Sequence, residues 1–300
     1  MSATASDGPK RPYRGRFAPS PSGALHLGSA VAAIASWLDA RAHGGDWLVR
    51  IDDLDPPRSV AGASDAILRD LERLGLSPDA PVVYQSTQTE RYADALMRLR
   101  ETGKLFDCAC SRKLVGKGPY PGTCRAGVAP GRAIRSQRID VATTKVNFDD
   151  RLCGAQHIDL GAQLGAFVVR RADGIFAYHL ATVVDDWHAG ITDVVRGADL
   201  LDSTAPQIQL QVLLRLPVPR YAHVPMVTHA DGQKLSKQSH ATPINSYESA
   251  YIWHAALKFL GLIDDFELVD ALTSDYKLVG LERWHHAHAS RTSAKTRSEK

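Results

Sequence analysis

The chain has 300 residues, of which 44% are hydrophobic and 23% are charged, so it can bury one or two cores and is not disordered throughout. Its net charge of +3 permits a nucleic-acid partner without requiring one. The polar leader at 1–12 does not resemble a secretory signal, and no run of about 18 apolar residues occurs, so we expect a cytoplasmic protein without a membrane partner.

Segments with the periodicities of strands and helices alternate over residues 13–105. A strand at 14–17 is followed by a turn rich in Pro, Ser and Gly and then by a helix over about 25–42. An apolar strand at 47–51 and two further helices complete this part. Strands and helices that alternate in units of this length predict a parallel α/β sheet.

The alternation breaks at residues 106–165, where Gly, Pro and Arg are frequent and the cysteines appear, and this segment is interpreted as an insertion. Strand-like runs at 166–171 and 183–184, followed by a helix over about 204–215, place the second half of the α/β unit at 166–242. The remaining segments are expected to form a small helical region and a tail, at 243–289 and 290–300.

Two short motifs could hold a nucleotide. His26 and Gly28 lie at the start of the first predicted helix, where unpaired backbone N–H groups attract phosphate and a glycine lets the ligand approach closely. Lys234, Ser236 and Lys237 form a loop whose two ammonium groups could clamp a polyphosphate. Taken singly, the first motif is explained equally well by a structural histidine, and the second is explained better by a solvated basic loop.

Together, the two motifs resemble the split ATP site of the class I aminoacyl-tRNA synthetases. This resemblance implies the fold of that family, a catalytic domain with a Rossmann-type parallel sheet. The usual family motifs are His-Ile-Gly-His and Lys-Met-Ser-Lys-Ser. This chain has His-Leu-Gly-Ser at 26–29 and Lys-Leu-Ser-Lys-Gln at 234–238, so Ser29 replaces the second histidine.

Three flanking segments, at 16–23, 50–58 and 195–199, resemble the glutamyl branch of this family. Within that branch, both altered motifs are similar to those of the shortened glutamyl-queuosine tRNA(Asp) synthetases. Only residues 239–300 follow the lysine loop, which is too short a segment for an anticodon-binding domain of typical size.

The resemblance implies a ligase that activates L-glutamate with ATP, without needing tRNA for this step, and transfers it to queuosine in the anticodon of tRNA(Asp). Magnesium is expected to accompany ATP, and the protein is expected to act as a monomer. His26 and Lys237 are the implied catalytic residues. The other implied ATP-binding residues are Gly28, Ser29, Lys234 and Ser236.

The resemblance also implies a set of glutamate-binding residues. Arg16 and Arg196 could hold carboxylates in bidentate geometry, and Tyr178 could supply a hydroxyl. Asp52, where most relatives have the longer Glu, would meet the ammonium group directly or through a water. The remaining members of the set are Phe17, Ala18, Pro19 and Ser20. A surface ion pair for the arginines and a core position for the tyrosine are the alternatives.

Three cysteines, Cys108, Cys110 and Cys124, fall in one short Gly- and Pro-rich segment, which points to a metal before redox chemistry. The resemblance implies a structural Zn²⁺ with Tyr120 as the fourth ligand, whereas spacing alone would offer Cys153 or His157. Three reduced thiols without a metal are the alternative.

Three other functions remain open from the sequence. An ordinary glutamyl-tRNA synthetase would charge tRNA(Glu), and a small-molecule nucleotidyltransferase would form an acyl-adenylate without RNA. A synthetase-derived RNA-binding protein would have no catalytic activity. The glutamate-binding segments and the complete pair of nucleotide motifs argue against the second and the third.

Overall fold

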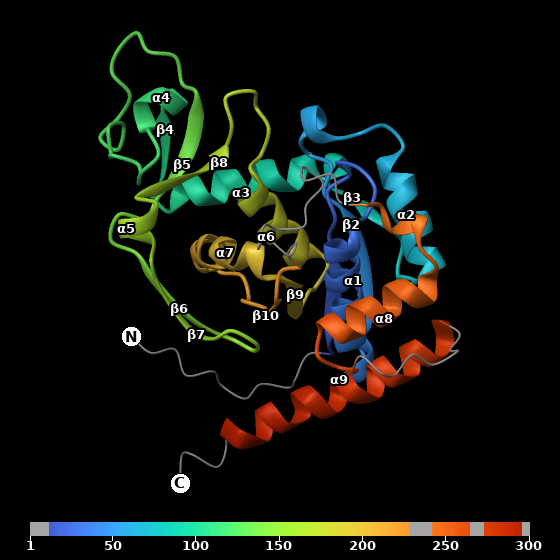
Figure 1. Cartoon of the computed structure of the whole chain (residues 1–300). Coiled ribbons are helices and arrows are strands. Elements are labelled where there is room, and N and C mark those ends of the chain that lie inside the picture. The colour runs from blue at the N-terminus through green and yellow to red at the C-terminus, as the bar shows by residue number, and fades with distance from the viewer. Residues whose placement is uncertain (1–11, 228–241, 265–272, 296–300) are drawn as a thin grey trace.

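The computed structural model describes residues 12–227, 242–264 and 273–295. Its first half contains a parallel sheet, in which β1 (Arg14–Phe17) pairs with β2 (Asp46–Ile51), and β2 pairs with β3 (Val83–Tyr84). Helix α1 (Leu27–Ala42) connects β1 to β2 and packs against them, as a crossover between parallel strands must. Helices α2 (Ala63–Arg73) and α3 (Thr89–Glu101) follow (Figure 1).

The second group of strands has the order β7-β6-β10-β9. Strand β9 (Asp193–Gly197), β10 (Arg220–Val224) and β6 (Lys145–Asp150) are parallel, and β7 (Gly154–Asp159) returns as a hairpin on β6. The two groups meet at β1 and β9, where the Thr192 N–H donates to the Arg14 carbonyl at 2.9 Å. The chain order of the strands reverses there, which makes this junction the topological switch point of the sheet.

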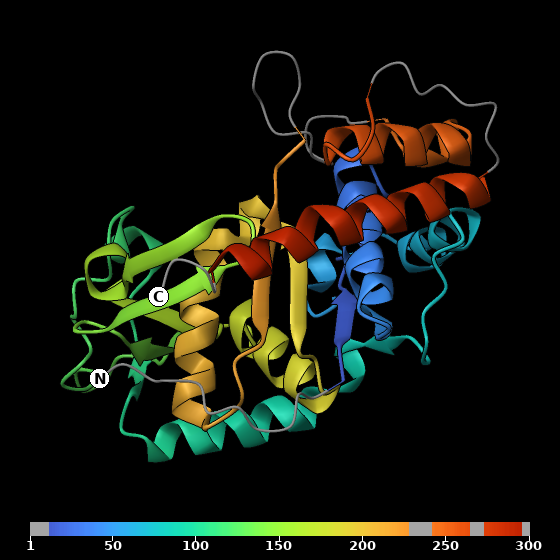
Figure 2. The ribbon, with the colours of Figure 1, turned by 90° about the horizontal axis from the view of Figure 1, so that it is seen from below.

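Two hydrophobic clusters form most of the core. Helix α1 is rich in small apolar residues and is buried on several sides, because the sheet lies on one side and α8 (Ser249–Phe259) and α9 (Thr273–Lys295) lie on another. Helix α9 runs across the molecule from α8 toward the β6–β7 hairpin (Figure 2). The second cluster joins α3 to α6 (Tyr178–His188) and α7 (Leu201–Leu214).

The strand expected at 183–184 is wrong, because these residues lie in the middle of α6. Leu180, Val183 and Val184 are buried, and α6 packs against both α3 and α7. A short helix that is buried on several faces has a nearly continuous apolar run, and such a run cannot be told from a buried strand by periodicity.

A smaller antiparallel sheet lies at one end of the molecule, with the order β4-β5-β8. It contains β4 (Leu105–Cys108), β5 (Ser136–Asp140) and β8 (Ala166–Arg170), and two short helices complete this lobe: α4 (Arg112–Val115) and α5 (Leu160–Gln163). The segment expected as an insertion at 106–165 therefore supplies strands to both sheets, because β6 and β7 join the large one. Helix α9 continues into the segment expected as a basic tail.

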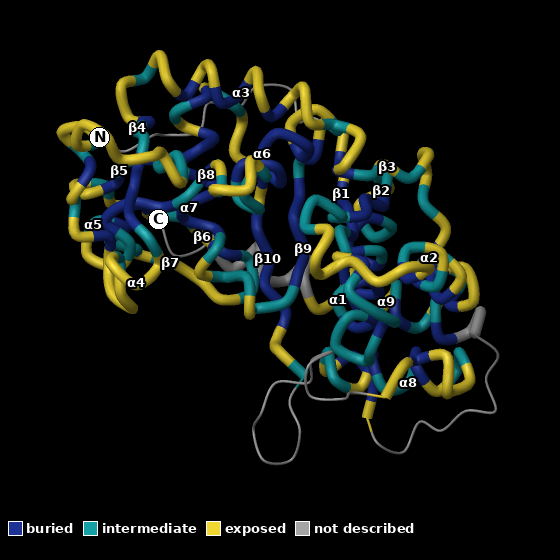
Figure 3. The backbone as a smooth tube through the Cα atoms, turned by 90° about the horizontal axis from the view of Figure 1, so that it is seen from above, coloured by how far each residue is buried: buried dark blue, intermediate teal, exposed yellow. Residues whose placement is uncertain are grey.

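The burial of the elements agrees with this arrangement of the sheets and helices. Strands β9 and β10 lie in the interior, whereas the outer turns of α3 face solvent (Figure 3). The carboxyl ends of β1 and β9 are therefore supported from behind by packed elements, and a site built on them is held by a rigid frame.

Candidate active site

A cleft of about 580 Å³ lies at the carboxyl ends of β1 and β9 and at the N-terminus of α1. This is the place where open parallel sheets bind their ligands. The structure gathers ten of the expected site residues around it: Arg16, Phe17, Ala18, Pro19, Ser20, His26, Gly28, Ser29, Tyr178 and Arg196. Lys234, Ser236 and Lys237 lie outside the described residues.

His26 is the N-cap of α1 and not a member of its first turn. Its Nδ1 accepts a hydrogen bond from the Ser29 N–H at 3.3 Å, and its Nε2 lies 3.2 Å from the Ser29 hydroxyl. Since Nδ1 accepts, the ring proton is on Nε2 and the imidazole is neutral. Ser29 therefore fixes the ring of His26 at the start of α1, where the positive end of the helix faces the cleft.

Arg16, near the end of β1, is a buried cation with a buried carboxylate partner. Its Nε lies 3.3 Å from both oxygens of Asp186 on α6, and its Nη2 lies 3.2 Å from Oδ2. Asp186 also accepts from Arg50 Nη1 at 2.6 Å. Burial alone would raise the pKa of Asp186, but the two guanidinium groups outweigh it and hold this pKa below its usual range.

Arg196, near the end of β9, is equally buried but has a different environment. Its Nε donates to His223 Nε2 at 3.0 Å, and its Nη1 donates to Gln207 Oε1 at 3.0 Å. Its Nη2 donates to the Thr204 hydroxyl at 2.9 Å and to the Leu200 carbonyl at 3.2 Å. None of these hydrogen-bond partners is a carboxylate, and burial lowers the pKa of Arg196.

Asp52 does not line the cleft, although the sequence suggested that it meets the substrate's ammonium group. Its Oδ1 accepts from Arg50 Nε at 2.7 Å, and both side chains are more than nine-tenths buried. Burial raises the pKa of Asp52 despite the attraction of Arg50. The structure thus places Asp52 in an internal ion pair with Arg50.

The sequence did not single out several buried titratable groups that support the cleft, namely Arg50, Asp185, Asp186 and His223. A signal was present in α6, where two adjacent aspartates interrupt an apolar run. Charged groups in an apolar run must be paired when they are buried, so such a run points to an internal ion-pair network. Its partners could not be read from the sequence.

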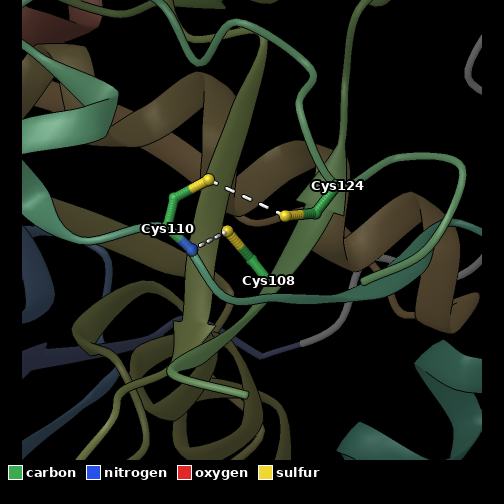
Figure 4. A group of neighbouring side chains, drawn as sticks. All are labelled: Cys108, Cys110 and Cys124. Carbon is green, nitrogen blue, oxygen red and sulfur yellow. Dashed lines mark hydrogen bonds between the residues drawn. The ribbon is translucent and has the colours of Figure 1, made fainter. Parts of the chain in front are cut away.

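A second group of chemically active side chains lies in the small lobe, where Cys108, Cys110 and Cys124 bring their sulfur atoms within 4.8 Å of one another (Figure 4). The Tyr120 hydroxyl lies 3.4 Å from Cys108 Sγ and 3.8 Å from Cys110 Sγ. The Cys110 and Cys124 sulfur atoms are 3.7 Å apart, which is far longer than a disulfide bond. All four side chains are buried.

These donors suit a tetrahedral zinc ion, which prefers thiolates. Burial raises the pKa of the Cys108 thiol, but hydrogen bonds from Tyr120, the Cys110 N–H and Arg138 lower it to about 7. Cys153 is not in the group, because its thiol lies against the His223 carbonyl. His157 is not in the group either, because its Nδ1 is hydrogen-bonded to Asn147 Oδ1 at 3.1 Å. Among the described residues, only the three cysteines form a metal-ligand cluster, with Tyr120 beside them.

Comparison with known proteins places the chain in a class. The family described as "tRNA synthetases class I (E and Q), catalytic domain" matches residues 13–116 and 129–262. The chain therefore belongs to this class of synthetases.

Within the described residues, none of the helices combines the length and the apolar character that a membrane span requires.

Curated relatives narrow the class further. The chain is 49% identical over 285 residues to the Glutamyl-Q tRNA(Asp) synthetase of Burkholderia cenocepacia strain HI2424, which covers 91% of this chain and 96% of that protein. It is 52% identical over 258 residues to the protein of that name from Aromatoleum aromaticum, covering 83% of this chain and 82% of that protein. Within the class, the chain belongs to the glutamyl-Q tRNA(Asp) synthetase family.

The solved structures support the fold. A glutamate-tRNA synthetase from Elizabethkingia anophelis superposes with a TM-score of 0.74 at 22% sequence identity, covering 92% of this chain. The chain spans 65% of that protein, slightly less than two thirds of it. The fold class expected from the sequence is confirmed.

Proposed function

We propose that the cleft activates L-glutamate with ATP and that the enzyme then transfers the glutamyl group to queuosine in the anticodon of tRNA(Asp). The observation that carries this proposal is the meeting of the α1 N-terminus, which suits phosphate, with the Arg196 guanidinium, which suits a carboxylate, in one cleft. Membership in the glutamyl-Q tRNA(Asp) synthetase family supports the choice of substrates.

In the first step, a carboxylate oxygen of glutamate attacks the α-phosphorus of ATP. The new O–P bond forms as the bond to pyrophosphate breaks, giving glutamyl-adenylate and pyrophosphate. The attacking carboxylate is already ionised at neutral pH, so no general base is needed. Catalysis then depends on positioning and on stabilising the charge at the phosphates, for which we assign His26, Gly28, Ser29 and the helix end, together with Mg²⁺.

In our assignment the lysine loop completes the ATP site. Lys237 would stabilise the transferring phosphate, with Lys234 and Ser236 as further contacts. The glutamate would lie against the strand ends, with its carboxylates near Arg16 and Arg196 and with Tyr178 beside it. In the second step, a nucleophilic oxygen of queuosine attacks the activated carbonyl, forms the ester and releases AMP.

The decisive experiment measures transfer of radiolabelled glutamate with ATP and three RNAs. We expect label on tRNA(Asp) that carries queuosine, and none on queuosine-free tRNA(Asp) or on tRNA(Glu). Glutamate-dependent pyrophosphate exchange should occur without any tRNA. Label on tRNA(Glu) would indicate ordinary charging instead, and RNA binding without exchange would indicate a protein that does not catalyse activation.

We also propose that Cys108, Cys110, Tyr120 and Cys124 hold one structural Zn²⁺, which would fix the Gly- and Pro-rich loop between β4 and β5. The test is zinc content measured after purification. Wild-type protein and Cys153→Ser should contain about one equivalent, since the Cys153 thiol lies elsewhere, whereas Cys124→Ser should lose most of it. Equal zinc in Cys124→Ser would overturn this assignment.

The remaining elements of the proposal are a cytoplasmic location, where ATP and tRNA are both present, and action as a monomer. Sedimentation of the purified protein at working concentration checks the second element. A stable dimer there would contradict it.

A further inference from the structure

Behind Arg196 lies a pair of buried residues that the reaction itself does not use, Asp150 and His223. They come from the ends of neighbouring parallel strands, β6 and β10, and each is at most 3% exposed. His223 Nδ1 lies 2.6 Å from Asp150 Oδ2, and His223 Nε2 lies 3.0 Å from Arg196 Nε. The three side chains therefore form a chain of hydrogen bonds that ends at the cleft.

The direction of these hydrogen bonds follows from chemistry. An arginine Nε can only donate, so His223 Nε2 must accept. The ring proton is then on Nδ1 and is donated to Asp150. This makes His223 neutral, in agreement with its burial and with the adjacent Arg196 cation, both of which lower its pKa. A protonated imidazole would point an N–H at the guanidinium.

The two carboxylate oxygens of Asp150 have different hydrogen-bond partners. Oδ1 accepts from the backbone N–H groups of Leu152, Cys153 and His223, at 3.0, 2.8 and 3.1 Å, and so holds the β6–β7 turn against β10. Oδ2 is left to His223. The aspartate thus has a structural oxygen and a second oxygen that selects the tautomer of the histidine.

We propose that Asp150 and His223 are positioning residues for the glutamate carboxylate: they hold Arg196 in place through a neutral acceptor. The proposal rests on the proposed function, in which Arg196 binds that carboxylate. Neither residue lines the active-site cleft. His223 Nε2 reaches Arg196 directly, and it also lies 3.2 Å from the Thr204 hydroxyl, which accepts from Arg196 Nη2. A carboxylate in the place of the imidazole would fix the guanidinium equally well but would compete with the substrate for its charge.

The variant Asp150→Asn tests the tautomer directly. Three backbone N–H groups favour the amide oxygen at the Oδ1 position, so the amide NH₂ faces His223 Nδ1. The imidazole must then accept at Nδ1 and carry its proton on Nε2, where it opposes the Arg196 Nε–H. In ¹⁵N-histidine-labelled protein, the protonated ring nitrogen of His223 should move from Nδ1 to Nε2. This measurement needs no substrate, so it tests the hydrogen bonds between Asp150, His223 and Arg196 even if the proposed function fails.

The kinetic test is glutamate-dependent pyrophosphate exchange by the full chain. For Asp150→Asn we expect the KM for glutamate to rise about tenfold, while kcat at saturating glutamate and the KM for ATP change less than about twofold. A tenfold fall in kcat together with a rise in the KM values for both glutamate and ATP would overturn the proposal and leave only a structural role. An unchanged His223 tautomer would overturn it as well.

Two substitutions of His223 provide a matched pair. His223→Gln places an amide oxygen near the position of Nε2 and keeps an acceptor for Arg196, so its KM for glutamate should stay within about threefold of wild type. His223→Asn keeps a donor for Asp150 but reaches less far, and should raise that KM about tenfold. Circular dichroism and thermal unfolding check that both variants are folded. Equal KM values for glutamate in the two folded variants would contradict the proposed positioning of Arg196 by His223. Wild-type protein without glutamate-dependent exchange would refute the proposed function instead.

Discussion

The ends of β1 and β9 face the same cleft with one arginine each, but the two arginines have opposite surroundings. Arg16 is bonded to Asp186, a carboxylate that it shares with Arg50. Within the described part of the chain, Arg196 donates its hydrogen bonds to neutral groups, those of His223, Gln207, Thr204 and Leu200. A buried ion pair fixes a side chain but neutralises it, whereas neutral acceptors fix it and leave its charge to a ligand. The charge of Arg16 at the β1 end is thus shared with Asp186, whereas the charge of Arg196 at the β9 end is left for the proposed substrate.

The largest expected effect follows from removing the carboxylate at the β1 end. Asp186→Asn leaves Arg16 and Arg50 buried with one counter-charge fewer, and we expect the free energy of unfolding to fall by about 3–5 kcal/mol. Urea unfolding at pH 7 measures it. A loss below about 1 kcal/mol would mean that the β1 end does not depend on this ion pair.

A second effect concerns pH and the neighbouring Asp185. Burial raises its pKa to about 6, although Arg50, Tyr92 and Gln85 oppose the rise. A carboxyl whose pKa is higher in the folded than in the unfolded state contributes stability at low pH and loses it as pH rises from about 4 to about 6. This contribution amounts to roughly 3 kcal/mol.

Asp185→Asn cannot ionise, so its stability relative to wild type should increase over that pH interval. Unfolding curves of both proteins at several pH values between 4 and 7 measure the difference, and comparing the two proteins cancels the histidines that titrate in the same range. A constant difference across the interval would show that Asp185 titrates normally.

At the β9 end, the expected effect is on activity. Arg196→Lys keeps the charge but cannot reproduce the four hydrogen bonds that orient the guanidinium. We expect kcat/KM for glutamate in pyrophosphate exchange to fall roughly 30-fold, or about 2 kcal/mol. An unchanged kcat/KM would remove the recognition role of the β9 end.

The smallest effect is expected from an exposed ion pair on the same strand as Arg16. Arg14 and Asp46 join β1 to β2 at 2.8 Å, with both side chains more than two-fifths exposed. Asp46→Asn should change the free energy of unfolding by less than about 1 kcal/mol, since water screens such pairs. It is the matched control for Asp186→Asn, and a similar loss in both variants would indicate that burial is not the cause.

Local features of the site were predictable from the sequence. The turn at 18–23 and the helix after it required only neighbouring residues, as did the position of His26 at the helix end. The short spacing of Cys108, Cys110 and Cys124 brought the thiols together in the same way. Motif resemblance then added Arg16, Tyr178 and Arg196 to the cleft.

The sequence by itself thus determined the α/β class, the approximate ends of helix α1 and the clustering of the three cysteines, because these depend on periodicity and on residues close together in the chain. Only the tertiary structure decided which buried charges meet. Arg16 reaches Asp186 on a helix of which the sequence suggested residues 183–184 as a strand. Asp52 pairs with Arg50 and does not line the cleft, and Arg196 meets His223. A buried charge takes the partner that packing brings within hydrogen-bond distance, and that partner can lie anywhere in the chain.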